Sequence, residues 1–544
     1  MRNAVNSQKC VEATWPARGA PVDNLPSHFL VDEEHQLSRR YVRFNVDALC
    51  NTVATAGDSS PVTAIEKMEG GFSKAFLMRK ANGTEVIAKI PCRIAGPPSL
   101  TTAGEVGVLE YGMMVPIPER VEWLRRTVGR HTSIPVPRVL SWSSDSSNAV
   151  GAEYIVMEKA AGVPLYERWR SMTEFERLQL IKNLTKLEAQ LSAISFPAYG
   201  GLYLRTDMSR PNRSLGDEID PSKSFCIGPS CDKKFNPDTT LEFDQGPWDS
   251  ISSLGISITR RELLRISRGQ QSRSSFYKGT VEQQTQLLEV TANLMKLLDS
   301  NQILTGACQP TLWHTDLHMG NIFVAPDECS RIVSLIDLQS TSILPAFLQA
   351  QWPIFLKPPQ TYDYVKGIFQ PQLPDNFNEL DKDSKAIAFR EWSQVKLAKA
   401  YEVSTYLEDR AAHNAMNVPR VFRELFTRCG EISEVGIVPL RECLIEILQN
   451  WSSLGFSGKC PYSFSRDELD AHGRQFAEYR AWHDVQALAE ECLDTDAEGW
   501  IAPPLDIDEK RRQNGELLDL YIEKVSGEKS AEDAKAMWPF TVEA

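Results

Sequence analysis

The chain contains 544 residues, 42% of them hydrophobic and 24% charged, which is typical of globular proteins and excludes the fibrous and intrinsically disordered classes. A single compact core rarely serves so long a chain, so we expect two or more structural units. The formal net charge of −13 disfavours nucleic acid as a partner, and no run approaches the ~20 apolar residues that an integral membrane segment requires.

The first 60 residues contain a helix-like stretch, "DEEHQLSRRYVRFNVDALCNTVATAG", that ends in a cluster of Gly, Asp, Ser and Pro. Basic residues near the start faintly suggest an organelle targeting signal, although an Arg-rich amphipathic face is missing. We therefore expect residues 1–60 to form an N-terminal segment with a helix and a possible targeting region.

Two strand-like runs then flank Asn82-Gly83 in "GGFSKAFLMRKANGTEVIAKIP". This dipeptide is the strongest short signal for a β-hairpin, because both of its positions tolerate positive φ. A helix in "TTAGEVGVLEYGMM" follows, and then strands in "IPVPRVLSW" and "AEYIVMEKA". The pattern predicts a small antiparallel sheet lobe with one helix over residues 61–157.

Long helical patterns dominate the rest of the chain, from 158 to 544. The first begins at Thr173 and Glu176, which form a capping-box pattern. Its apolar residues recur at three- and four-residue steps and predict a core face made of Leu178, Ile181, Leu184, Leu187, Leu191 and Ile194. Residues from about 205 to 275 are rich in Ser, Asp, Pro and Gly, so we expect an irregular insertion with a short helix near "RRELLRIS". The fold class is α+β, with two lobes.

The 11 cysteines are scattered, without the dense spacing of a secreted disulfide framework, which favours a reducing compartment. Cys226 and Cys231 are a close pair. No second pair with zinc-ligand spacing accompanies them, so metal binding there is disfavoured.

Polar residues with a chemical pattern are concentrated between 312 and 340. In "LWHTDLHMGNIFV", Asp316 and Asn321 are five residues apart, and Asp337 ends the apolar run "RIVSLID". Carboxylate and carboxamide oxygens are the ligands that Mg²⁺ prefers. A turn between two buried strands would explain the segment taken alone, but the residues upstream favour an active site.

Those upstream residues are Gly70, Gly71 and Ser73 at the opening of the hairpin, and Lys89 on its second strand. Glycines let backbone N–H groups approach phosphates closely, and a lysine on the following strand can reach the same phosphates. The ordered set is glycine turn, strand lysine, helix glutamate, His-x-Asp-x-x-x-x-Asn and a metal-binding aspartate, which is the plan of kinases.

With this ordered set the chain resembles the protein-kinase-like phosphotransferases of the aminoglycoside phosphotransferase superfamily. More narrowly, it resembles the family of altered inheritance of mitochondria protein 9, from about Asp32 to Pro359 and more weakly in the tail. The narrower resemblance rests on "EGGFSKAF", "TSIPVPRVL", "GAEYIVMEKAAGVPL", "FCIGPS", "LWHTDLHMGNIFV", "RIVSLIDLQSTS" and "LQAQWPIFLKPP".

The resemblance implies a bilobal protein-kinase-like fold and an ATP- and Mg²⁺-dependent phosphotransferase. It implies that Asp316 is the catalytic aspartate, which accepts or orients the proton of a substrate hydroxyl. Asn321 and Asp337 would hold Mg²⁺ on the nucleotide phosphates. Lys89 would bind the α- and β-phosphates and pair with Glu105.

The resemblance also implies that Met157, Glu158 and Ala160 connect the lobes and meet the adenine of ATP. The family name implies a mitochondrial location, with the cytoplasm as the alternative.

Two of these residues have alternative interpretations. Glu105 also forms a capping-box pattern with Thr102, in which the glutamate would only satisfy a helix start, and Glu110 is a second candidate for the lysine partner. His314 is expected to bond backbone near the site rather than act as a base, and the position of His318 is left open.

The sequence departs from the family at two places. Residues 112–128, "GMMVPIPERVEWLRRTV", are extra sequence directly after the glutamate helix, and they could displace it. Leu338 stands where relatives more often have an aromatic residue.

The type of acceptor is indicated by two absences from the sequence. Thr315 replaces the arginine of His-Arg-Asp, and no Ala-Pro-Glu follows, so a loop-regulated protein kinase is disfavoured. A small-molecule acceptor is expected instead. The alternative is a nucleotide-binding, pseudokinase-like scaffold with little or no transfer activity.

Overall fold

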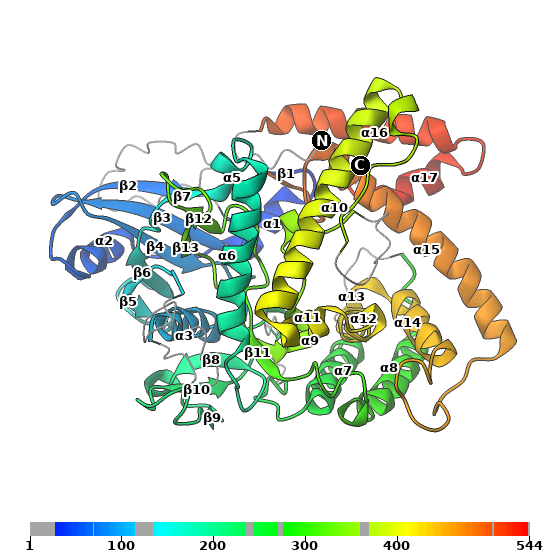
Figure 1. Ribbon diagram of the computed structural model, residues 1–544, viewed down its shortest axis with the longest axis horizontal. Coiled ribbons are helices and arrows are strands. Elements are labelled where there is room, and N and C mark those ends of the chain that lie inside the picture. Colours follow the sequence, from blue (N-terminus) through cyan, green and yellow to red (C-terminus); the bar gives the residue numbers. More distant parts are fainter. Residues whose placement is uncertain are drawn as a thin grey trace.

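The computed structural model describes residues 28–68, 70–114, 134–235, 243–269, 276–359, 369–502 and 505–541. They form an α+β structure with a small antiparallel sheet on one side and a large group of helices beside it (Figure 1). The predicted fold class, a small sheet lobe next to a larger helical lobe, is confirmed. The extra segment 112–128 lies mostly outside the described residues.

The small lobe is built on a five-stranded antiparallel sheet in the order β2-β3-β4-β6-β5. β3 and β4 form the predicted hairpin, and Gly83 in its turn has a φ of +85°, a conformation that favours glycine. The hairpin prediction is confirmed. The strands of the sheet are β2 (Val62–Met68), β3 (Ser73–Lys80), β4 (Glu85–Pro91), β5 (Val139–Ser143) and β6 (Tyr154–Glu158).

Each face of this sheet is covered by a different helix. On β4, Ala88 and Ile90 pack in a core with α2 (Val46–Thr55). Because side chains alternate along a strand, Lys89 between them points to the opposite face. There it meets α3 (Leu100–Met114), the helix predicted in this region.

In the large lobe, α6 and α10 pack side by side through the middle of the molecule (Figure 1). The capping box of Thr173 and Glu176 begins α6, as predicted. The predicted core face is correct except for Leu178, which is 38% exposed because it lies near the start of the helix, at the edge of the buried face. Leu180 is buried instead.

The helices of this lobe are α5 (Leu165–Trp169), α6 (Glu174–Ser192), α7 (Ile251–Ser267), α8 (Val281–Met295), α9 (Ala346–Gln349), α10 (Lys382–Glu408), α11 (Arg410–Met416), α12 (Arg420–Cys429), α13 (Ile432–Val435) and α14 (Ile437–Gln449). Its short strands are β7 (Val163–Pro164), β11 (Pro310–Leu312), β12 (Ile322–Val324), β13 (Ile332–Leu335) and β14 (Ile343–Pro345).

The region from about 205 to 275 is more regular than we expected. A three-stranded antiparallel sheet of β8 (Gly201–Leu204), β10 (Phe225–Gly228) and β9 (Arg213–Ser214) forms there and packs against α3. The segment near "RRELLRIS" belongs to α7, a helix of 17 residues. The expectation of a short helix was wrong, because α7 has 17 residues. Most of the described residues between 205 and 250 lie outside helices and strands.

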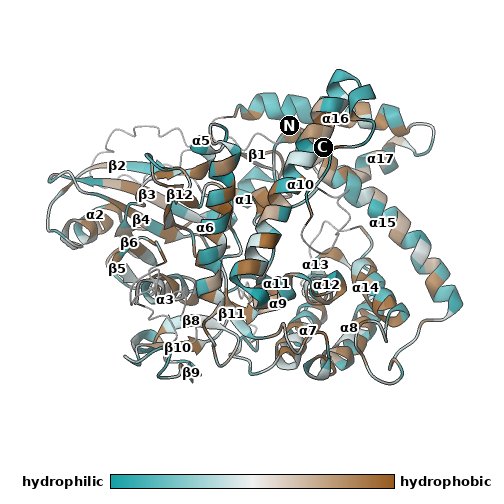
Figure 2. Cartoon of the chain, in the orientation of Figure 1, coloured by the Kyte–Doolittle hydropathy of each residue, from teal (hydrophilic) through white to brown (hydrophobic). Residues whose placement is uncertain are grey.

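The two ends of the described chain form a further group of elements, here called the terminal unit. Its elements are β1 (His28–Phe29), α1 (Glu33–Arg40), α15 (Arg466–Leu493), β15 (Trp500–Ile501), α16 (Ile507–Val525) and α17 (Ala531–Met537). β1 pairs with β15, and a separate hydrophobic cluster forms around Leu30, Leu493 and Phe540. Figure 2 shows α16 as mostly hydrophilic, which fits a helix with one buried residue.

The single helix expected between 32 and 57 is divided into α1 and α2, with a non-helical link from Tyr41 to Asn45. The side chain of Asn45 caps α2 by accepting from the N–H of Ala48. The tail is mostly helical, as predicted. In the described part of the chain, no helix is long and apolar enough to cross a lipid bilayer.

Candidate active site

Asn321 of "LWHTDLHMGNIFV" and Asp337 of "RIVSLID" lie at the same end of the hairpin formed by β12 and β13. Asn321 directly precedes β12, and Asp337 follows β13 by two residues. The N–H of Ile336 donates to the carbonyl oxygen of Asn321 at 3.1 Å, which extends the antiparallel pairing by one residue. The hairpin therefore places the amide of Asn321 and the carboxylate of Asp337 at the same edge.

His314 links the loop of Asp316 to the residue before Asp337 through both of its ring nitrogens. Nε2 lies 2.9 Å from the carbonyl oxygen of Ile336, and Nδ1 lies 3.3 Å from the backbone nitrogen of Asp316. Burial lowers the pKa of His314, which favours the neutral ring with one donor and one acceptor nitrogen. His314 thus bonds backbone on both sides, as the sequence led us to expect.

The loop between His314 and β12 is also held by Asn321. Its Nδ2 donates to the carbonyl oxygen of Asp316 at 2.9 Å, and the side chain of Asn321 is buried. Asp316 itself is exposed. His318 is half-buried, and its Nδ1 accepts from the N–H of Gly320 at 3.0 Å. The loop therefore presents one free carboxylate to solvent on a backbone fixed from two sides.

Lys89 is the centre of the charged part of the site. Its Nζ lies 2.7 Å from Oε1 and 3.0 Å from Oε2 of Glu105, and 2.7 Å from Oδ1 of Asp337. Burial alone would lower the pKa of Lys89, but the two carboxylates outweigh it, so the pKa is raised and the ammonium is retained.

The alternative for Glu105, a capping box with Thr102, is wrong. α3 begins at Leu100, so Thr102 lies inside its first turn, and the carboxylate of Glu105 points to Lys89. Glu110, the second candidate, lies five residues further along α3 and is not among the hydrogen-bond partners of Lys89 that the described residues supply.

Asp337 has a φ of +62°, in the left-handed region that few residues other than glycine adopt. Such a backbone persists only where its surroundings fix it. The ammonium of Lys89 holds the pKa of Asp337 below its usual value, although burial opposes this. Asp337 is therefore an ionised carboxylate with one oxygen bonded to Lys89.

Gly70 and Gly71 lie in the turn between β2 and β3, and Ser73 begins β3. A Cβ atom at Gly71 would meet no other atom within 4 Å, so packing within the chain does not require a glycine there. One turn residue, Gly71, accepts a hydrogen bond at its carbonyl oxygen from Nε of Arg40 at 3.3 Å. No pattern in the sequence indicates this contact.

Met157 and Glu158 end β6, and Ala160 follows in the segment that leads to β7. Met157 is buried and Glu158 is exposed, with an ion pair to Arg138. Since β7 pairs with β12, the segment passes from the sheet lobe directly to the hairpin that holds Asn321.

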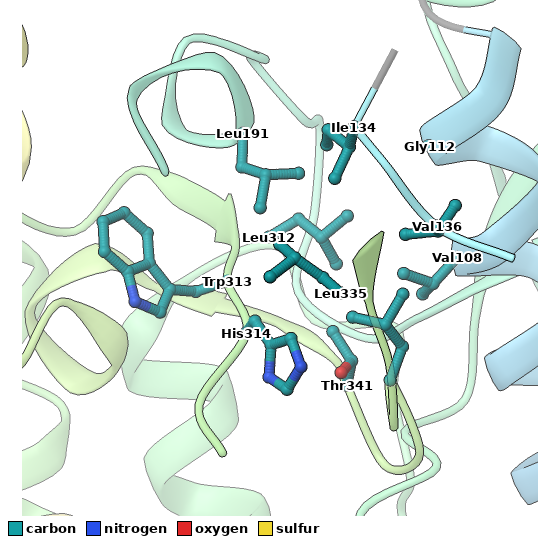
Figure 3. Close-up of a pocket in the computed structure, with 11 residues that line it drawn as sticks. Val108, Gly112, Ile134, Val136, Leu191, Leu312, Trp313, His314, Leu335 and Thr341 are labelled. Atoms are coloured by element: carbon teal, nitrogen blue, oxygen red, sulfur yellow. The ribbon is translucent and has the colours of Figure 1, made fainter. Parts of the chain in front are cut away.

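A small apolar cavity of about 20 Å³ lies behind this site, between α3 and the loop that contains His314 (Figure 3). Leu338, the position that departs from the family, is buried and lines it. The other lining residues are Val108, Gly112, Ile134, Val136, Leu191, Leu312, Trp313, His314, Leu335 and Thr341. Sequence reasoning missed this cavity because its walls come from five separate segments.

Cys226 and Cys231 are both buried and free, and Sγ of Cys231 lies 3.3 Å from the carbonyl oxygen of Thr341. The described residues contain no group of three or more His, Cys, Asp or Glu side chains that could hold a metal ion. The pair therefore packs the sheet of β8, β10 and β9 near the loop after Asp337.

A family model described as the phosphotransferase enzyme family matches residues 114–347. The chain is 30% identical over 478 residues to the subtelomeric hrmA-associated cluster protein of Aspergillus fumigatus, which covers 80% of this chain and 88% of that protein. It is 22% identical over 535 residues to the altered inheritance of mitochondria protein 9 of Yarrowia lipolytica, which covers 90% of this chain and 85% of that protein. The resemblance stated from the sequence is confirmed.

Two solved structures are also similar. One is the ethanolamine kinase of Plasmodium vivax, with 10% identity, a TM-score of 0.31 and coverage of 76% of this chain and 81% of that chain. The other is APH(2″)-IIa in a ternary complex with streptomycin and ATP, with 13% identity, a TM-score of 0.34 and coverage of 77% and 100%. Both TM-scores are below 0.5.

Proposed function

The chain belongs to the phosphotransferase enzyme family, and from this premise we propose that it transfers a phosphoryl group from ATP to the hydroxyl of a small-molecule acceptor, with Mg²⁺. The observation that supports this best is the contact of Lys89 with both Glu105 and Asp337. It joins β4 of the sheet lobe to the loop after β13, so that the ammonium of Lys89 lies between the carboxylates of Glu105 and Asp337.

The residues fit a nucleotide with its metal ion. Nδ2 of Asn321 is used by Asp316, which leaves the amide oxygen as an acceptor, and Oδ2 of Asp337 is not the atom that Lys89 binds. Mg²⁺ usually binds proteins through one or two carboxylates together with water and phosphate oxygens, and not through a large cage of side chains. When bound, it would neutralise phosphate charge as the phosphoryl group is transferred.

On the nucleotide side, we assign phosphate contacts to the turn of Gly70 and Gly71, to Ser73 and to Lys89. The space beside Gly71 supports this, because a Cβ atom there would meet no atom of the chain within 4 Å and a phosphate could approach the backbone. Met157, Glu158 and Ala160 would meet the adenine, since they connect the two lobes next to β12. In this proposal residues 61–157 form the nucleotide-binding lobe and residues 158–544 the helical lobe with the catalytic loop, 312–340.

Asp316 would be the catalytic residue. It is the exposed carboxylate of the loop, and His314 and Asn321 fix the backbone on either side of its side chain. A carboxylate placed in this way accepts a hydrogen bond from the acceptor hydroxyl and orients it for attack. Positioning of this kind, with charge neutralisation, is most of what phosphoryl transfer needs.

A small molecule is the acceptor that we propose, since Thr315 replaces the arginine that loop-regulated protein kinases use and no Ala-Pro-Glu follows Asp337. The name of the Yarrowia lipolytica relative supports a mitochondrial location for this chain, with the cytoplasm as the alternative.

The test is a thermal-shift titration with ATP, with and without Mg²⁺, followed by ATP turnover. We expect Mg²⁺ to strengthen the stabilisation by ATP in the wild type and in Asp327→Ala, an exposed aspartate of the same hairpin, but not in Asp337→Ala. Absence of any Mg²⁺-dependent stabilisation of the wild type would refute the proposal.

The same experiment separates the enzyme from a pseudokinase-like scaffold. Asp316→Asn should still be stabilised by ATP and Mg²⁺ and should lose turnover, because the neutral amide no longer orients the hydroxyl proton. A scaffold would bind the nucleotide without turnover in the wild type. A phosphorylation screen of small metabolites with hydroxyl groups would then name the acceptor.

A further inference from the structure

The terminal unit is connected to the phosphate-binding turn through α1. Within the unit, the N–H of Leu30 donates to the carbonyl oxygen of Gly499 at 2.9 Å, next to the pairing of β1 with β15. Arg511 on α16 lies 2.8 Å from Glu33 on α1. α1 is therefore held by elements that follow it by more than 450 residues.

Arg40, the last residue of α1, has contacts in both directions. Its Nη2 forms an ion pair with Glu498, between α15 and β15, and its Nη1 lies 2.7 Å from Oε1 of Gln36. The guanidinium lies 4.7 Å above the ring of Phe29 in β1. These contacts bury Arg40 and fix the direction of its remaining donor, Nε.

That donor binds the carbonyl oxygen of Gly71 at 3.3 Å. Because the peptide group is planar and trans, holding this carbonyl on the α1 side turns the following N–H, that of Phe72, to the opposite side. A second contact lies close by, where Nζ of Lys74 is 5.5 Å from the ring of Tyr41. Arg40 at the end of α1 thus contacts Gly71 in the turn, and Tyr41, the next residue, contacts Lys74 near the start of β3.

We propose that Arg40 is a positioning residue for the phosphate-binding turn, and that Glu498 keeps it in place, so that nucleotide affinity depends on the docking of the terminal unit. This inference rests on the function proposed above, because it assumes that the turn of Gly70 and Gly71 binds phosphates. By thermodynamic linkage, nucleotide binding also strengthens the contact between the terminal unit and the sheet lobe.

Arg39 supplies a matched control within the same helix. It lies 3.4 Å from Glu498 and also bonds Gln36, but it forms no hydrogen bond or ion pair with the described residues of the turn. Arg40→Met and Arg39→Met remove the same charge next to the same glutamate. Only the first removes the hydrogen bond to Gly71. A difference between the variants is therefore not explained by the loss of a charge beside Glu498.

The experiment measures the Kd of ATP with Mg²⁺ and the rate of ATP hydrolysis at saturating ATP for the full chain. We expect Arg40→Met to raise the Kd about tenfold, as for the loss of one charge-assisted hydrogen bond, with the saturated rate within about twofold. Arg39→Met should leave both unchanged. Arg40→Lys should raise the Kd almost as much as Arg40→Met, because one ammonium does not reproduce the three donor nitrogens of the guanidinium.

Glu498→Gln is the second variant, since this residue is partly exposed and its loss leaves Arg40 in the chain. It should raise the Kd less than Arg40→Met, and the double variant should equal Arg40→Met alone. If the wild type binds ATP and the Kd values of Arg40→Met and Arg39→Met are equal, the inference is overturned and the proposed function stands. A wild type that does not bind ATP would refute the proposed function itself.

Hydrogen exchange gives an independent readout of the linkage. Adding ADP with Mg²⁺ should increase the protection of the amides of Leu30 and Trp500 in the wild type and in Arg39→Met, and not in Arg40→Met. Protection that rises equally in all three would overturn the proposal.

Discussion

The Nζ atom of Lys89 lies 2.7 Å from Oδ1 of Asp337, so a strand of the sheet lobe is bonded to the loop after β13 although 248 residues separate them in sequence. The same ammonium binds Glu105 on α3. Two carboxylates thus share one cation. Lys89 therefore links α3, β4 and the loop of Asp337.

Lys89→Met tests this arrangement, since it removes the cation and keeps a side chain of similar length. We expect the free energy of unfolding to fall by about 3 kcal/mol, because Glu105 remains buried without a counterion. Glu105→Gln should cost less, because Asp337 still pairs with Lys89. Denaturant unfolding measures both, and equal losses in the two variants would contradict the central role of the lysine.

His314→Ala should destabilise the loop of Asp316. The substitution leaves the carbonyl of Ile336 and the N–H of Asp316 without their partner, and each such loss costs about 1–3 kcal/mol when the group is buried. His318→Ala is the control, since its ring accepts one hydrogen bond from a neighbour in the same turn. We expect His314→Ala to lower both the free energy of unfolding and the rate of ATP turnover, and His318→Ala to change both only slightly.

Much of the site was predictable because its signals are local. The turn of Asn82 and Gly83 identifies a hairpin, and this places Lys89 on the strand that follows. The spacing of Asp316 and Asn321 reflects one tight loop. Their roles in catalysis remain predictions, but the structure brings these residues together with Asp337.

The terminal unit was not predictable, because its contacts join residues more than 450 positions apart. Nothing in the pattern around Arg40 indicates that its partner is Glu498. The division of the expected helix into α1 and α2 did have a local signal, since Asn45 is a typical N-cap. The non-local contacts of α1 include ion pairs with Glu498 and with Arg511 on α16.

The small sheet of β8, β10 and β9 likewise depends on contacts outside the local sequence. β8, β9 and β10 are two to four residues long, too short for a clear alternating pattern. They are stabilised by pairing with one another and by contact with α3. A composition rich in Ser, Asp, Pro and Gly therefore concealed a small sheet.

Gly107 on α3 should be intolerant of substitution because of this contact. A Cβ atom there would overlap the backbone carbonyl of Leu202 in β8, whereas one at Gly112 would lie 3.7 Å from the nearest atom, on Val136. We expect Gly107→Ala to cost about 1–3 kcal/mol and to weaken ATP binding, by moving Glu105 away from Lys89. Gly112→Ala, in the same helix, should be neutral or slightly stabilising. A comparison of unfolding and ATP affinity for the two variants measures this, and similar behaviour would show that β8 does not position α3.

Glu188 on α6 should make stability depend on pH. Its carboxyl group is buried, accepts a hydrogen bond from the hydroxyl of Tyr401 at 2.8 Å, and its Oε1 has no hydrogen-bond partner among the described residues. Burial raises the pKa of Glu188 to about 8, from 4.5 for an ordinary glutamate. Between these values the unfolded state has released a proton that the folded state retains, so the free energy of unfolding falls as the pH rises.

Glu188→Gln imitates the neutral acid and should remove this dependence. At pH 8 the variant should be more stable than the wild type by about 1–3 kcal/mol, and near pH 5 the two should be similar. Glu174→Gln, an exposed residue at the start of the same helix, is the control and should follow the wild type. Denaturant unfolding at pH 5, 6.5 and 8 measures the three proteins. Parallel curves for wild type and Glu188→Gln would show that Glu188 is ionised in the folded protein. If Glu188 instead keeps its proton in the folded state, the stabilities of the two proteins converge at low pH.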